Sequence, residues 1–85
     1  MNRNIEWIRG AAERGVAECA FTLGVMYEQG LVVSQSLEEA AKWYLKAANA
    51  GAAAAQYAIA KMYESGQGIT QSGLQAYRYA LMAAN

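Results

Sequence analysis

The chain repeats itself at a fixed offset of 36 residues. Between Trp7 and Asn49, 16 of 43 positions carry the residue that stands 36 places later, including a Met-Tyr-Glu run that starts at Met26 and again at Met62. Composition alone would match about one position in ten. A repeat of this length with helical patterning predicts a solenoid of helix-turn-helix units, each burying its apolar face against its neighbours.

Proline is absent and glycines fall at repeat-related places, which favours helices separated by glycine turns over strands. The chain is therefore predicted to be all-α, an α-solenoid of antiparallel helix pairs. We expect about five helices, over residues 5–14, 16–29, 37–49, 52–65 and 73–84. One domain, 1–85, would hold a leading half repeat (3–14), repeat one (15–50) and repeat two (51–85).

The second helix of each unit opens with a capping signal. Ser36 stands three residues before Glu39, and Ser72 stands three residues before Gln75. In such a capping box the serine hydroxyl accepts the amide hydrogen three residues on, while the Glu or Gln side chain reaches back to the serine amide. Glycines just past each first helix predict left-handed C-terminal caps.

Apolar and small residues recur with helical spacing and predict the core. On the first helices they share one face at i, i+3, i+4 and i+7. The second helix of repeat one carries a similar stripe, and one repeat position holds an aromatic residue in all three units, predicted to wedge between successive units. These sets are Ala20, Leu23, Gly24 and Tyr27, with Gln56, Ile59, Ala60 and Tyr63; Ala40, Trp43, Tyr44 and Ala47; and Trp7, Trp43 and Tyr79.

Composition excludes several classes of function. Seven Lys and Arg balance seven Glu, which leaves no basic stripe for nucleic acid, and no run approaches the roughly 20 apolar residues of a membrane span. The chain contains no His and no Asp, so the usual catalytic triads and metal sites cannot be assembled. Cys19 is the sole cysteine and is expected to be a compact buried thiol. We therefore expect no catalysis, cofactor or metal, and, without a secretion signal, the cytoplasm as the default location.

Small, apolar and aromatic residues follow a fixed order: Gly15, Ala17, Leu23, Gly24, Tyr27, Gly30, Val33, Ala40, Trp43, Tyr44, Ala47, Ala48 and Gly51, and again Gly51, Ala53 and Gln56 in the second unit. This order resembles the Sel1-like repeats (SLR), relatives of the tetratricopeptide repeats. Ser36 and Ser72 stand where that family usually has aspartate, and Ala60 replaces a glycine. The resemblance implies an α-solenoid adaptor or scaffold without catalytic activity, whose first helices line a concave surface.

Residues of the first helices that point away from the core stripe are the candidate binding surface for a protein or peptide. Phe21 and Tyr57 share one repeat position and would form an aromatic floor; alternatively, both rings pack between adjacent first helices. The candidate partner-binding residues are Glu18, Phe21, Val25, Glu28, Tyr57, Lys61 and Glu64.

The two ends of the array are expected to expose apolar side chains. Self-association into a homo-oligomer, burial by a partner, or excision from a longer array would each account for such ends. Two further functions stay open beside the adaptor: an immunity- or inhibitor-type protein that uses the same concave surface to block a toxin or enzyme, and a self-assembling structural protein. The residues concerned are Ile5, Trp7 and Ile8, and Leu74, Tyr77, Leu81 and Met82.

Overall fold

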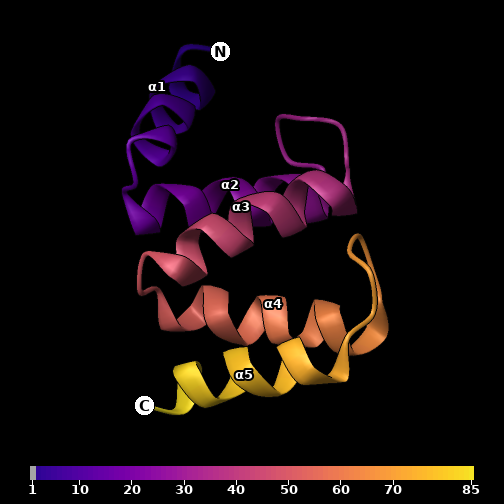
Figure 1. The fold of residues 1–85 in the computed structure, drawn as a ribbon. Coiled ribbons are helices and arrows are strands. Elements are labelled where there is room, and N and C mark those ends of the chain that lie inside the picture. Colours follow the sequence, from indigo (N-terminus) through magenta and orange to yellow (C-terminus); the bar gives the residue numbers. More distant parts are fainter. Residues whose placement is uncertain (1) are drawn as a thin grey trace.

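The computed structural model describes residues 2–85 and confirms the all-α prediction. Within that range the chain forms five helices and no strand: α1 (Asn2–Glu13), α2 (Ala17–Gln29), α3 (Leu37–Asn49), α4 (Ala53–Ser65) and α5 (Gly73–Ala84). The α2–α3 and α4–α5 pairs stack on each other, with α1 at one end and α5 at the other (Figure 1). The longer loops after α2 and α4 lie on the same side of the stack, so the repeats run in register.

Of the two hydrogen bonds predicted for each capping box, only the one accepted by the serine hydroxyl forms. Ser36 and Ser72 each accept the amide hydrogen three residues on, at 3.2 Å. The serine amides donate instead to the carbonyls of Tyr27 and Tyr63, at 2.9 and 3.0 Å. The expected return contact from Glu39 and Gln75 is therefore wrong: each serine amide already ties its loop to the preceding first helix.

The turn after the first helix differs between the repeats. Val32 has a φ of +69°, a conformation that a β-branched residue adopts only under strain. Its repeat equivalent is Gly68, with a φ of +74°. At Gly68 a Cβ atom would also collide with the carbonyl of Leu37, because this loop lies against the start of α3. Repeat two therefore meets both requirements with glycine, whereas repeat one holds the same turn with a strained valine.

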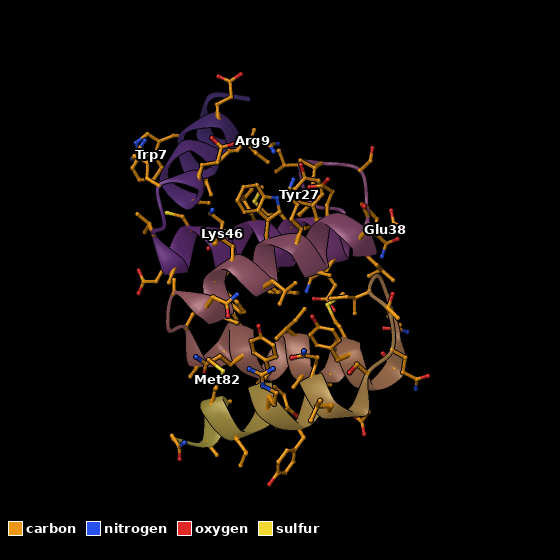
Figure 2. All side chains as sticks on the ribbon, viewed as in Figure 1. Trp7, Arg9, Tyr27, Glu38, Lys46 and Met82 are labelled. Atoms are coloured by element: carbon orange, nitrogen blue, oxygen red, sulfur yellow. The ribbon has the colours of Figure 1, made fainter. Side chains whose placement is uncertain are left out.

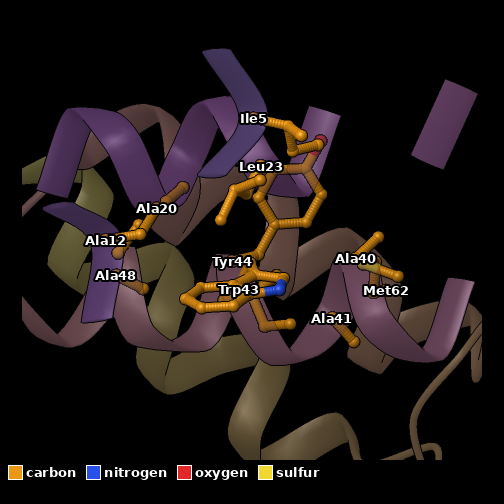
Figure 3. Packing of buried hydrophobic residues seen from close by; sticks show 13 residues of the cluster. Ile5, Ala12, Ala20, Leu23, Ala40, Ala41, Trp43, Tyr44, Ala48 and Met62 are labelled. Atoms are coloured by element: carbon orange, nitrogen blue, oxygen red, sulfur yellow. The ribbon is translucent and has the colours of Figure 1, made fainter. Parts of the chain in front are cut away.

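The predicted core stripe is buried. Leu23 and Ile59 are fully enclosed, and Trp43 and Tyr44 pack among alanines contributed by α1, α2 and α3 (Figure 3). Tyr27 and Tyr63, at the ends of the stripes, are half-buried against this cluster. The Trp43 indole Nε1 is buried without a hydrogen-bond partner.

Gly24 makes room for Tyr44. A Cβ atom at Gly24 would lie 2.6 Å from two ring carbons of Tyr44, so any side chain there would displace the ring. The equivalent positions in repeat two are Ala60 and Ala80. Repeat two has no aromatic ring at the position of Tyr44, so it does not need a glycine at the position of Gly24. This explains why Ala60 departs from the family pattern.

The aromatic position shared by the three units is not equally buried, and the expectation for Trp7 is wrong. Trp43 is buried, and Tyr79 stacks on Tyr63 with ring centroids 5.9 Å apart. Trp7 is 70% exposed and extends away from the stack (Figure 2). Among the described residues no helix precedes α1, so Trp7 has no first helix to pack against.

The neighbouring isoleucines of α1 also differ from the expectation. Ile5 is buried and Ile8 is partly buried, and both pack against the core cluster. They lie on the face of α1 that meets the rest of the fold, whereas Trp7 lies outside it. At the other end Leu74, Tyr77, Leu81 and Met82 are exposed, as expected.

We predict that Gly24→Ala lowers the free energy of unfolding by about 1–3 kcal/mol, because the new methyl group collides with the Tyr44 ring. This loss outweighs the better helix propensity of alanine. Urea denaturation followed by circular dichroism measures the change.

Two variants identify the cause of this loss. Ala60→Gly, which meets no equivalent ring, should cost only about 1 kcal/mol from helix propensity. In a Tyr44→Leu background, where a flexible side chain replaces the ring, the cost of Gly24→Ala should shrink. An unchanged cost in that background would show that the ring is not its source.

Candidate protein-binding groove

A groove runs between α2 and α4, and Tyr44 of α3 contributes to its floor. Its volume is about 600 Å³. Met62 and Ala58 line it from α4, beside the residues predicted from the sequence. We call this surface the concave groove.

The structure brings five of the seven candidate residues together in the concave groove: Phe21, Glu28, Tyr57, Lys61 and Glu64. The other two do not line it. Val25 is half-buried against the core, and Glu18 is exposed in the first turn of α2. Partner binding by these five residues stays a prediction.

The two aromatic residues of the groove have different environments. Phe21 is half-buried, and its ring centroid lies 5.6 Å from that of Tyr44 at an angle of 44°. Tyr57 is 60% exposed, and the Lys61 ammonium lies 5.4 Å from its ring centroid. Phe21 thus has a packing role, whereas Tyr57 presents most of its surface to the solvent.

Tyr44 joins the core to the groove. Its ring is buried, but its hydroxyl donates a hydrogen bond to Glu28 Oε1 at 2.6 Å. Burial raises the pKa of Tyr44 above its usual value, and the hydrogen bond and the charge of Glu28 raise it further. The phenol therefore stays protonated and holds the Glu28 carboxylate in place.

Sequence reasoning assigned Tyr44 only to the core. The signal that could have placed it in the groove is the contrast between repeats, because Tyr44 aligns with Ala80 while its neighbour Ala40 aligns with Ala76. Tyr44 is buried whereas Ala80 is exposed, so the surroundings of this repeat position differ between the units.

Glu28 and Glu64 occupy equivalent places at one end of the groove. Each lies in the last turn of its first helix, and neither last turn contains a basic residue. Their backbone carbonyls accept hydrogen bonds from the side chains of Gln35 and Gln71, both at 2.8 Å. The two repeats therefore fasten the backbone of the acidic rim in the same way, whereas the hydrogen bond from Tyr44 holds only the Glu28 carboxylate.

Three other features of the described residues bear on function: possible metal ligands, the Cys19 thiol and the length of the helices. No group of three or more His, Cys, Asp or Glu side chains within them could hold a metal ion. Cys19 is expected to be buried; it is half-buried and packs against the core. None of the helices described has the length and apolar character needed to cross a membrane.

The family of the chain is shown by its repeats. The model of the Sel1 repeat family matches residues 17–51 and 53–85. The chain belongs to the Sel1 repeat family. Repeats of this family generally mediate protein–protein interaction, and its members are typically non-catalytic.

Two solved structures share the fold. The chain is 35% identical to a Sel1 repeat protein from Oxalobacter formigenes, with a TM-score of 0.92 over 94% of this chain and 33% of that one. It is 34% identical to c5321, a protective antigen of uropathogenic Escherichia coli strains with an SLR fold, with a TM-score of 0.85 over 93% of this chain and 17% of that one. The chain thus spans a third or less of each relative. No curated protein matches it.

We predict that the Tyr44 phenol makes stability depend on alkaline pH. Because its folded pKa lies above the unfolded value of about 10, its contribution is complete below pH 10 and is lost as the pH rises further. Urea unfolding between about pH 8 and pH 11 should show the wild type losing stability with a steeper slope than Tyr44→Phe.

The Tyr44→Phe variant differs from the wild type by this one phenol, so the difference in slope isolates Tyr44. At neutral pH the Tyr44→Phe variant should be less stable by about 1 kcal/mol, the usual contribution of one hydrogen bond. Parallel pH profiles for the two proteins would contradict the assigned pKa shift.

Proposed function

We propose that the chain is a non-catalytic interaction module that binds a protein or peptide segment in the concave groove. The observation that carries this proposal is the convergence of exposed Tyr57 with the acidic rim in one groove of about 600 Å³. Large aromatic side chains that stay exposed on a small domain are typical of binding surfaces.

The shape of the groove also supports this proposal. Its walls are the parallel first helices of two successive repeats, with the Tyr44 ring and Met62 between them. Rigid helices hold these side chains in fixed positions, so a partner would find the surface already formed. An amphipathic helix or an extended peptide would fit such a groove.

Substitution of Tyr57 tests the proposal. The wild-type domain would first select binders from a library of random peptides displayed on phage, and fluorescence anisotropy would measure the affinity of the best synthetic peptide. Tyr57→Ala should weaken binding about tenfold or more, as expected for a central aromatic contact. Its free energy of unfolding should change by less than about 0.5 kcal/mol, because the ring is exposed.

Tyr77→Ala is the matched control. It removes the same side chain from a position on α5 that is 63% exposed and outside the concave groove. Tyr57 and Tyr77 both line a second, shallower hollow between α4 and α5, so the control also separates the concave groove from that hollow. The control should leave the affinity of the selected peptide unchanged. Binding that survives Tyr57→Ala, or that is lost equally with Tyr77→Ala, would place the partner elsewhere.

A second candidate function is self-association, which the exposed face of α5 favours. Leu74, Tyr77, Leu81 and Met82 are all exposed there, although they are large and apolar. Contiguous apolar surface of this kind marks interaction sites on soluble domains. The partner would be a second copy of the chain.

Solution mass tests the second candidate. Light scattering coupled to size exclusion should show the mass rising from one chain toward two as the concentration increases. Leu81→Lys should keep the chain monomeric, because burying the lysine at the contact is unfavourable. Leu31→Lys makes the same substitution in the exposed loop after α2 and should leave self-association unchanged. A constant monomer mass for the wild type at all concentrations would rule out self-association.

A further inference from the structure

We propose that the concave groove selects a segment that carries an apolar side chain and, about 10 Å from it, an arginine. The apolar side chain would contact Phe21 and Tyr57, and the guanidinium would lie between Glu28 and Glu64. This inference rests on the proposed function and adds the chemistry of the partner.

The spacing follows from the repeat. Glu28 lies seven residues after Phe21 on α2, and Glu64 lies seven residues after Tyr57 on α4. Seven residues of α-helix span about 10 Å at 1.5 Å per residue. Both walls therefore place an aromatic ring toward one end of the groove and a glutamate toward the other. The glutamates lie in the last turns of α2 and α4, which lead into the two longer loops on one side of the stack (Figure 1).

This separation restricts the sequence of the partner. In a helical segment, residues seven apart lie on one face at about the same distance. In an extended segment, residues three apart are separated by about 10 Å, at roughly 3.3 Å per residue. We therefore expect the arginine seven residues from the apolar anchor in a helix, or three residues from it in an extended peptide.

Within the part of the chain whose side chains the structure describes, neither glutamate of the acidic rim forms an ion pair. Among the described side chains no Lys or Arg nitrogen lies within 4.0 Å of a glutamate carboxylate. Lys61, the cation of the groove, lies over the Tyr57 ring, and Glu28 is held by the neutral hydroxyl of Tyr44.

The helices add to the negative potential at this rim. The C-terminal end of a helix carries partial negative charge, so a glutamate in the last turn is unfavourable to the helix itself. Both first helices nevertheless end with a glutamate in that turn and without a basic residue. Two carboxylates and two helix ends thus face one end of the groove, and a cation complements them.

Arginine suits this rim better than lysine. Its planar guanidinium can donate to two carboxylates at once and can also stack on an aromatic ring, and the Tyr44 hydroxyl lies beside Glu28. The chain already pairs one arginine with a tyrosine: Arg9 Nη2 donates to the Tyr27 hydroxyl at 3.0 Å, and the guanidinium carbon lies 6.0 Å from the centroid of the Tyr27 ring.

The test compares the peptides selected by two forms of the domain. The probe is the random-peptide phage library, panned in parallel against the wild type and against Glu28→Gln combined with Glu64→Gln. Glutamine keeps an acceptor for the Tyr44 hydroxyl, and circular dichroism would verify folding. The matched control combines Glu13→Gln with Glu38→Gln, which removes the same charge from exposed positions outside the groove.

Wild-type and control domains should select peptides enriched in arginine at the stated spacings from an apolar residue, and the groove variant should not. The best wild-type peptide should bind the groove variant about tenfold more weakly at low salt, and this difference should narrow as salt increases. Replacing its arginine with glutamine should have the same effect on wild-type affinity.

Failure of this inference can be separated from failure of the proposed function. Peptides that lose affinity with Tyr57→Ala but show no arginine enrichment would overturn the arginine site and leave the groove as a binding surface. Enrichment of acidic residues, which would point to Lys61, would overturn it in the same way. Peptides whose affinity is unchanged by Tyr57→Ala would overturn both the arginine site and the proposed function.

Discussion

The contact between Gly24 and the Tyr44 ring is the constraint on which much of repeat one depends. It lets α2 and α3 approach closely, and it seats a ring that packs on Phe21 and reaches Glu28 with its hydroxyl. Core and groove are therefore built from one side chain. A change at Gly24, which does not line the groove, would alter both the stability of the helix pair and the position of the acidic rim.

The two repeats have the same backbone fold, but their side chains have different roles. Repeat one supplies the buried aromatic residues Trp43 and Tyr44, whereas no residue of α5 in repeat two is fully buried. The α4 helix of repeat two contributes the exposed Tyr57 and Lys61. The groove is thus complete only where successive repeats meet, which is why neither unit would form it alone.

The fold could be predicted from the sequence because its signals are local. The serine caps and the apolar spacing along each helix act within one or two helical turns, and the repeat period shows that the same signals recur in the next unit. The groove could be predicted only in part, because the contact between Tyr44 and Glu28 joins residues on different helices, 16 positions apart. The error at Trp7 has a similar origin: repeat equivalence gives a residue its position, but its burial depends on which helix lies beside it.

The loops after α2 and α4 are each fastened twice to the helix that precedes them. A serine amide bonds to a tyrosine carbonyl, and a glutamine side chain bonds to the carbonyl of Glu28 or Glu64. The rim that carries the two carboxylates is thus ordered before anything binds. Most of the conformational entropy lost in forming a complex would fall on the partner, so short or stiff segments would compete better than long flexible ones.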